Sequence, residues 1–247
     1  MNMCPLIHVG ALEVESYALM TYVGFFIAAS YFYTRLVKSE KIDRFQVLLF
    51  LTALFFAQLA GGTIIPFFWS WHRRGAFPSH FFTGHSGRFF HSVFLSAIAF
   101  VIAYCKIKKW PTKRTLDYLA VSTGIMSPIG RIGCFLAGCC AGKPTTLPWA
   151  VKFPNKPFPV HPTQLYHFGV ELFILLPILL WIDKKKQFDG QTFWSYLFLY
   201  SIFRFGIEYI RINPIAWMSL THAQLFSIAA VLVASTVLAK QLFRSVR

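Results

Sequence analysis

Residues 46–68 read QVLLFLTALFFAQLAGGTIIPFF, a run that contains no charged side chain. An α-helix needs about 20 apolar residues to cross the hydrocarbon core of a bilayer. Further apolar stretches lie on both sides of this run, and together they predict about seven transmembrane helices. The stretches are residues 17–37, 46–68, 88–105, 116–137, 164–182, 192–210 and 220–240.

The composition excludes an ordinary soluble domain. Of the 247 residues, 56% are hydrophobic and 13% are charged, and the mean hydropathy is +0.54. Soluble domains carry about 25% charged residues. A chain of this size has no core large enough to bury 28 Phe and 7 Trp. We therefore predict an all-α polytopic membrane protein, with residues 1–247 forming a single transmembrane domain.

The net charge of +15 could indicate nucleic-acid binding, but the distribution of the charge argues against it. The Lys and Arg residues lie in short clusters between the apolar runs and form no continuous basic face. Such clusters indicate membrane topology, because cytoplasmic loops are enriched in Lys and Arg. Fifteen of the 24 fall in the first, third and fifth connections and the C-terminal tail. We predict an outer N-terminus, a cytoplasmic C-terminus and no nucleic-acid partner.

The two longest connections, residues 69–87 and 138–163, fall on the outer side in this topology. The second contains six prolines, which fix φ and remove backbone donors, so we expect irregular structure or a short strand pair there. Connections this long tend to be functional. Glu13 and Glu15 stand where a signal peptide would have its basic region, so we expect the first apolar run to remain as a helix.

Ionisable side chains inside the predicted spans are costly in lipid and therefore indicate function. Arg131 lies between Gly130 and Gly133, in a span that we expect Pro128 to break. A guanidinium at this position suits a phosphate, which it binds through two parallel hydrogen bonds. The phosphate most available in a bilayer is a phospholipid headgroup.

We expect further polar residues to complete a cavity for an anionic lipid around Arg131. Arg204 and Glu208 are four residues apart, so a mutual ion pair along one helix face is the alternative for them. A buried hydrogen-bonding role is the alternative for His91, and Glu171 is expected to brace helices. The remaining candidates are Tyr17, Tyr22, Tyr200 and Arg211, of which Tyr22 is also explained by the aromatic belt.

Three of the five cysteines, Cys134, Cys139 and Cys140, lie close together in the sequence. Structural zinc sites commonly have a C-x2-C spacing and a fourth ligand, so the spacing C-x4-C-C indicates a metal only weakly. A disulfide from Cys4 to Cys139 or Cys140 and a set of buried inert thiols both remain open. We predict no metal and no cofactor.

Several stretches carry a family resemblance: SYALMTYVGF at 16–25, GRIGCFLAGCCAGKPT at 130–145, HPTQLY at 161–166 and YLFLYSIFRFGIEYIR at 196–211. They resemble, in the same order, motifs of prolipoprotein diacylglyceryl transferases, the bacterial enzymes that begin lipoprotein maturation. Asp117 and FFH at 89–91 fit weaker motifs of that family. The resemblance covers nearly the whole chain.

The resemblance implies a multi-pass enzyme of the bacterial inner membrane. It implies transfer of the diacylglyceryl group of phosphatidylglycerol to the cysteine thiol of a prolipoprotein signal peptide, with release of glycerol phosphate. Arg131 and Arg204 would stabilise the leaving phosphate, and His91 would be the base that generates the thiolate. The implied substrate-binding residues are Tyr17, Tyr200, Glu208, Arg211, Gly142, which lets the loop turn, and Cys139.

The chain departs from the family pattern at several positions. Cys134 and Cys139 stand where the family usually has an asparagine and an acidic residue. His167 replaces a glutamate, and Ser92-Val93 replaces the Gly-Gly that commonly follows the histidine. Two alternatives therefore stay open: a phospholipid-binding or transport protein on the same scaffold without turnover, and a transferase with a different acceptor.

Overall fold

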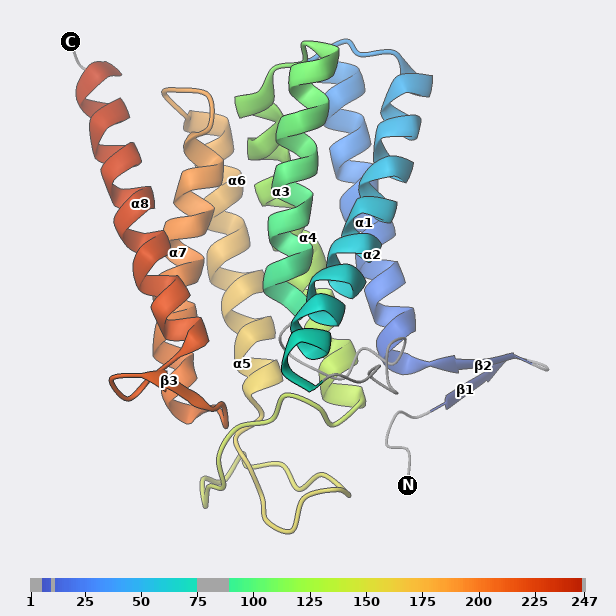
Figure 1. Ribbon diagram of the computed structural model, residues 1–247, viewed down its shortest axis with the longest axis vertical. Coiled ribbons are helices and arrows are strands. Elements are labelled where there is room, and N and C mark those ends of the chain that lie inside the picture. The colour runs from blue at the N-terminus through green and yellow to red at the C-terminus, as the bar shows by residue number, and fades with distance from the viewer. Residues whose placement is uncertain (1–5, 10–11, 75–88, 246–247) are drawn as a thin grey trace. The chain divides into compact units, whose positions relative to one another are not determined.

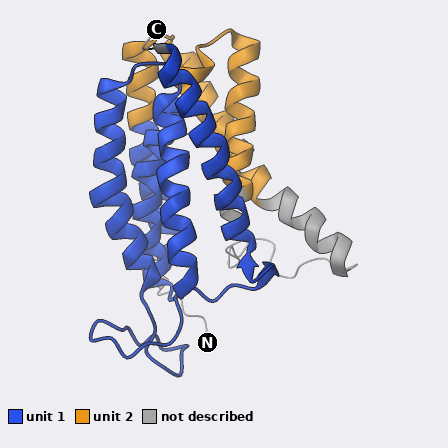
Figure 2. Ribbon diagram, turned by 90° about the vertical axis from the view of Figure 1, so that its left-hand side faces the viewer, with its two compact units in different colours: residues 1–30, 117–247 blue, residues 31–116 orange. Residues whose placement is uncertain are grey.

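The structure of the protein is a computed structural model that describes residues 6–9, 12–74 and 89–245, with side chains described over 15–62 and 92–244. The chain is mostly helical (Figure 1). It divides into two compact units, residues 31–116 and the remainder (Figure 2). The predicted single domain remains a prediction.

Each predicted apolar stretch lies largely on one helical rod, which confirms the helices that the hydropathy indicated; residues 220–221, at the start of the last stretch, form a strand instead. A π-helical turn, Glu171–Leu175, joins α5 and α6 into one rod, and a 3-10 turn, Glu208–Ile210, follows α7. The helices are α1 Ser16–Ser39, α2 Arg44–Arg74, α3 Phe89–Lys108, α4 Thr112–Leu136, α5 Thr163–Val170, α6 Leu176–Lys185, α7 Gln191–Ile207 and α8 His222–Ser245.

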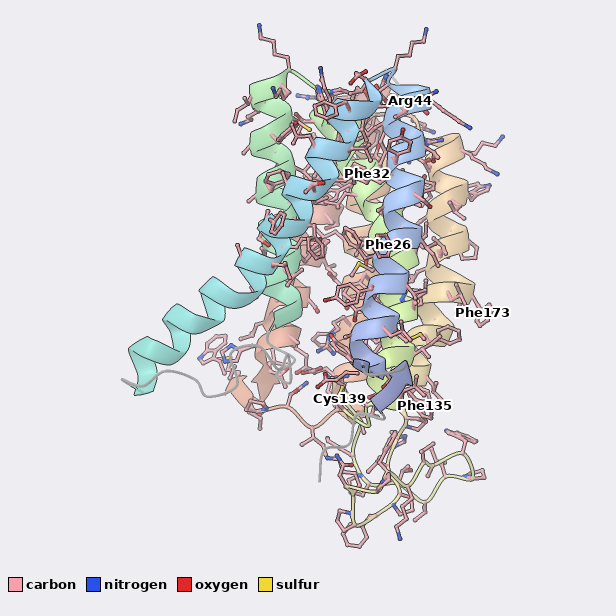
Figure 3. The ribbon with its side chains drawn as sticks, turned by 90° about the vertical axis from the view of Figure 1, so that its right-hand side faces the viewer. Phe26, Phe32, Arg44, Phe135, Cys139 and Phe173 are labelled. Atoms are coloured by element: carbon pink, nitrogen blue, oxygen red, sulfur yellow. The ribbon has the colours of Figure 1, made fainter. Side chains whose placement is uncertain are left out.

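Among the described residues, four helices are long and apolar enough to cross a membrane: Arg44–Gly62, Thr112–Leu136, Thr163–Lys185 and His222–Arg244. Large apolar side chains on these helices are exposed, as Phe173 and Leu232 are at 69% and 62%. Figure 3 shows Phe173 pointing away from the neighbouring helices. Lipid is the solvent that suits such surfaces. The predicted number of about seven spans and the orientation of the termini remain predictions.

Two expectations about helix boundaries are wrong. Residues 69–74 of the predicted loop 69–87 are helical, because α2 continues to Arg74; residues 75–88 lie outside the described part of the chain. Pro128 does not break its span, since α4 runs through it without interruption. Helices in a membrane tolerate proline where neighbouring groups satisfy the freed carbonyl, so Arg131 projects from regular helix.

Unit 31–116 has an aromatic core around Phe50. Its ring stacks on Phe32 with 5.7 Å between the centroids and meets the edge of Tyr104 at 4.9 Å. Phe100 and Trp110 complete the cluster at 5.6 and 5.4 Å. Offset and edge-on pairs of this kind add to the stabilisation from burial. The cluster joins α1, α2 and α3 to the connection that precedes α4.

In the other unit, Asp117 fastens the start of α4 to the start of α7. Its carboxylate accepts hydrogen bonds from the backbone N–H groups of Gly190 and Phe193, both at 2.9 Å. Lys186 forms an ion pair with it at 3.0 Å and a second with Asp183 at 3.1 Å. Asp117 thus caps the N-terminus of α7, where a negative charge also complements the helix dipole.

Strands occur only as short pairs among the described residues. β1, Leu6–Val9, pairs antiparallel with β2, Leu12–Glu15, and β3, Ile215–Trp217, pairs with β4, Leu220–Thr221. In the proline-rich connection between α4 and α5, Val160 forms isolated bridges with Pro144 and Val151. The prediction of irregular structure with short strand pairing is confirmed there.

Candidate functional site

Three arginines lie near one another in the unit that contains α4, α5 and α7. Arg131 and Arg204 both act electrostatically on the buried pair His167 and Glu171, and both act on Arg211. Arg131 projects from α4, Arg204 from α7, and Arg211 follows the 3-10 turn. The structure therefore brings the two arginines singled out in the sequence to the same group of side chains.

Arg131 and Arg204 differ in how their charge is balanced. Arg204 donates from Nη1 to Oε2 of Glu208 at 2.5 Å. Arg131 is half-buried and lies beside the Tyr200 hydroxyl. Within the described part of the chain, no carboxylate lies within ion-pair distance of Arg131. A half-buried guanidinium with no carboxylate in direct contact is suited to bind an anion.

Glu208 is fully buried and both of its carboxylate oxygens are bonded to protein groups. Oε1 accepts from Asn213 at 2.6 Å and from Thr221 at 2.8 Å, while Oε2 accepts from Arg204. Arg211 lies 3.8 Å from the same Oε2. These contacts favour the alternative considered for Arg204 and Glu208, a mutual ion pair along one helix face. In the structure, this ion pair also orients Arg204. The predicted role of Glu208 in substrate binding stays a prediction.

His167 was not predicted to be a site residue from the sequence. Nδ1 of His167 lies 2.8 Å from Oε1 of Glu171, and both side chains are buried. Nε2 of His167 is buried and has no hydrogen-bond partner among the described residues. In a neutral ring whose Nδ1–H donates to the carboxylate, Nε2 is a free acceptor. The i,i+4 spacing of His167 and Glu171 was the signal that could have found this pair.

The three tyrosines predicted from the sequence have different surroundings. Tyr200 is buried, stacks on Tyr196 at 5.6 Å, and lies within electrostatic range of Arg131 and Glu171. Tyr17 lies near the cysteines of the α4–α5 connection. Gly133 allows α1 and α4 to meet here, because a Cβ at this position would lie 3.2 Å from the Tyr17 Cα. Tyr22 is half exposed, as the aromatic-belt interpretation expects.

The backbone after α4 is fixed by side chains from two later elements. Thr163 and Gln164, at the start of α5, donate to the carbonyls of Cys140 and Cys139, each at 2.6 Å. Arg211 donates from Nη1 to the same Cys140 carbonyl at 3.2 Å. Arg211 therefore holds the connection in place, while its predicted contact with substrate stays a prediction.

Gly142 is required for a close approach of three segments. A Cβ at Gly142 would lie 2.6 Å from the Ile210 carbonyl oxygen and 2.8 Å from both His161 and Thr163. Its φ is outside the left-handed region, unlike that of Gly138 at 63°. We expected this glycine to allow a turn of the loop. The structure gives a different reason, because the neighbouring segments leave no space for a side chain at this position.

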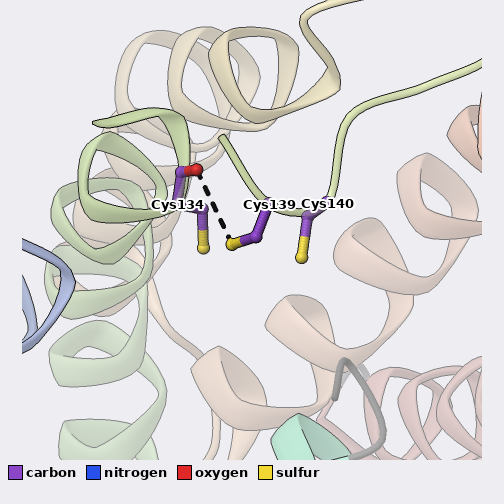
Figure 4. Close-up of side chains that lie close together, drawn as sticks. All are labelled: Cys134, Cys139 and Cys140. Atoms are coloured by element: carbon purple, nitrogen blue, oxygen red, sulfur yellow. Dashed lines mark hydrogen bonds between the residues drawn. The ribbon is translucent and has the colours of Figure 1, made fainter. Parts of the chain in front are cut away.

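Cys134, Cys139 and Cys140 form a cluster of free thiols (Figure 4). The sulfur atoms lie within 4.8 Å of one another. Hydrogen bonds from the thiols of Cys134 and Cys139 lower the pKa of Cys140, and the charge of Arg211 lowers it further against the effect of burial. The hydrogen bonds with Cys134 and Cys140 raise the pKa of Cys139. Cys4, the proposed disulfide partner, lies outside the described residues.

His91 lies in the first turn of α3, but its side chain is outside the described residues. Its predicted role as the catalytic base stays a prediction. The described part of the site consists of three arginines, the His167–Glu171 pair, two stacked tyrosines and a thiol cluster. Positive charge exceeds negative charge among the arginines and carboxylates of this group, so the site is suited to an anionic ligand.

Comparison with protein families identifies the scaffold. The model of the family described as prolipoprotein diacylglyceryl transferase matches residues 5–240. The chain belongs to this family. Family membership confirms the resemblance found in the sequence motifs.

Individual prolipoprotein diacylglyceryl transferases are similar over most of their length. One from Mannheimia succiniciproducens is 30% identical over 240 residues, which is 95% of this chain and 88% of the relative. One from Clostridium perfringens, whose name carries the number 2, is 30% identical over 82% of this chain and 81% of the relative. One from Clostridium tetani is 39% identical over 54% of this chain and 55% of its own. All three are named phosphatidylglycerol–prolipoprotein diacylglyceryl transferases, so the enzyme class is transferase.

Proposed function

We propose that this chain transfers the diacylglyceryl group of phosphatidylglycerol to the cysteine thiol of a prolipoprotein signal peptide, releasing glycerol phosphate, at the outer leaflet of a bacterial inner membrane. The observation that carries the proposal is the group of arginines on α4 and α7, in which Arg131 has no carboxylate partner within the described residues. Its relatives' names supply the substrates.

The chemistry requires positive charge at the leaving group. As the carbon–oxygen bond to phosphate breaks, negative charge grows on the departing phosphate. Guanidinium groups already in position stabilise that charge more than they stabilise the intact lipid, which lowers the barrier. Glu208 keeps Arg204 oriented by its bond to Nη1 and leaves the other N–H groups for the lipid.

The acceptor thiol must lose its proton, because the thiolate is the nucleophile. His91 is the base that the family pattern implies. His167 is a second candidate, because its Nε2 is a buried acceptor within the described site and Glu171 orients the ring. Substitution of each histidine in turn by glutamine shows which of the two is the base. Only the variant that lacks the base should lose the fall in turnover that the wild type shows as the pH is lowered.

The proposal is tested with purified protein in nanodiscs that contain phosphatidylglycerol and a lipobox peptide. The wild type is expected to release glycerol phosphate and to form a thioether on the peptide. Arg131→Ala is expected to lower the release by about 100-fold or more, by analogy with other preorganised donors. Arg44→Ala is the matched control, because Arg44 is an exposed guanidinium at the start of α2.

The outcomes separate the alternatives. Lipid binding by the wild type without release of glycerol phosphate would favour a phospholipid-binding or transport protein. Release of glycerol phosphate without modification of the peptide would favour a different acceptor. Equal loss of activity in Arg131→Ala and Arg44→Ala would remove Arg131 from the mechanism.

A further inference from the structure

The thiol cluster at the end of α4 has the composition of a metal site. The sulfur atoms of Cys134, Cys139 and Cys140 lie within 4.8 Å of one another and face a common space (Figure 4). Zinc–sulfur bonds are about 2.3 Å long, which places thiolates around one tetrahedral zinc about 3.8 Å apart. Small side-chain rotations close the difference. No His or carboxylate joins the cluster within the described part of the chain.

The backbone that carries these thiols is held before any ligand binds. Hydrogen bonds from Thr163, Gln164 and Arg211 fix the carbonyls of Cys139 and Cys140. Cys140 has a φ of 62°, a left-handed conformation that is unfavourable for a residue with a side chain. This conformation keeps the Cys140 sulfur beside the other two. A metal site needs such support from its surroundings to hold its geometry.

Nearby positive charge would also balance a site made of three thiolates and a divalent cation. Three thiolates and one Zn²⁺ carry one net negative charge, which would be costly in a half-buried place without compensation. Arg131 and Arg211 both lie within electrostatic range of Cys140. Their positive charges offset the excess negative charge of the occupied site.

We propose that Cys134, Cys139 and Cys140 bind one Zn²⁺ whose fourth coordination position is open to an external thiol. Three protein ligands and one open position are the arrangement of catalytic zinc sites, whereas structural sites use four protein ligands. Soft thiolate ligands select zinc over magnesium or calcium. The identity of the external thiol rests on the proposed function: it is the cysteine of the prolipoprotein.

The open position gives the cysteines a role in the transfer. The acceptor thiol would bind as the fourth sulfur ligand and lose its proton to the histidine base of the proposed function. Its sulfur then forms the bond to the glyceryl carbon while the carbon–oxygen bond to phosphate breaks, and the bonding electron pair leaves with glycerol phosphate. The resulting thioether is a weak ligand and dissociates. In this way Cys134 and Cys139, which depart from the family pattern, act on the acceptor.

Metal content and X-ray absorption test the site without reference to turnover. Protein purified from zinc-containing medium is expected to hold about one zinc per chain, with three sulfur ligands at about 2.3 Å. Cys134→Ser, Cys139→Ser and Cys140→Ser are each expected to lower the zinc content or the affinity for zinc at least tenfold. Cys105→Ser is the matched control, because Cys105 is a buried thiol outside the cluster, on α3.

A second measurement addresses the open position. Adding a lipobox peptide is expected to raise the number of sulfur ligands from three to four, and a peptide with serine in place of cysteine is expected to leave it at three. Zinc-free protein, or a disulfide within the cluster in protein isolated without oxidant, would overturn the proposal. An unchanged sulfur count with the cysteine peptide would also overturn it. Zinc binding without turnover would contradict the proposed function and leave the zinc site standing. Turnover by a zinc-free enzyme would contradict the zinc site and leave the proposed function standing.

Discussion

Replacement of Gly142 by alanine is expected to destabilise the connection that carries the thiol cluster. The added methyl group would lie 2.6 Å from the Ile210 carbonyl oxygen and 2.8 Å from His161 and Thr163. The backbone angle of Gly142 itself permits alanine, so the cost arises from the neighbours. To make room, the segments must separate and strain the hydrogen bonds from Gly142 N to His161 O at 2.9 Å and from Lys143 N to Ile210 O at 2.8 Å.

The magnitude follows from these contacts. Overpacking of a filled site costs about 1–3 kcal/mol, and two lost backbone hydrogen bonds cost about 1 kcal/mol each. The expected loss is therefore about 3–5 kcal/mol, which corresponds to a fall in melting temperature of roughly 6–20 °C for a chain of this size. Thermal unfolding in detergent measures it, and turnover should fall in parallel.

Gly206→Ala is the matched control for this prediction. No atom lies within 4 Å of a Cβ built on Gly206, which is an exposed residue of α7. Alanine in a helix is favoured over glycine by about 1 kcal/mol, so this variant should melt at the same temperature or higher. Equal melting temperatures of the two variants would refute the account of Gly142 as a point of close approach.

Three further predictions concern side chains around the helix ends. Asp117→Asn is expected to lower the free energy of unfolding by about 2–3 kcal/mol, because it removes an ion pair with Lys186 and weakens the cap of α7; an unchanged unfolding midpoint would contradict this. Asp117 raises the pKa of Lys186 above 10.5 despite the opposing effect of burial. The wild type should therefore have a higher free energy of unfolding than Lys186→Met. This difference should be largest below about pH 10.5 and should decline as the pH rises through the raised pKa of Lys186; a difference that stays constant through that range would refute the prediction. Glu208→Gln should lower kcat by about tenfold or more and should also weaken the binding of phosphatidylglycerol, because Arg204 loses the carboxylate that orients it; unchanged binding and turnover would contradict that role.

The helices were predictable from the sequence because their apolar runs match the thickness of a bilayer. Residues 46–68 predicted the apolar part of α2, but hydropathy could not show that the helix continues to Arg74, since it ends with the polar residues His72, Arg73 and Arg74. Pro128 was expected to break α4, but helix geometry absorbs one missing N–H where packing supports it.

The site was only partly predictable. Ionisable residues in apolar runs marked Arg131 and Arg204 because charge in lipid is costly. Hydrogen-bond partners from distant segments could not be predicted. Thr221, for example, donates to Glu208 from the small hairpin of β3 and β4. The three cysteines were noted in the sequence, but no metal was predicted, because the spacing C-x4-C-C is only a weak metal motif. Left-handed residues Gly138 and Cys140 turn the chain so that the sulfurs meet.

In the proposed mechanism, the guanidinium groups of Arg131 and Arg204 hold one phospholipid phosphate between them. A double-mutant cycle on the affinity for short-chain phosphatidylglycerol tests it most directly, with Arg131→Gln, Arg204→Gln and the double variant. Each single variant is expected to bind at least about tenfold more weakly, with a coupling energy of about 1–3 kcal/mol between the two positions. Additive losses with no coupling, or unchanged affinity in either single variant, would contradict the claim.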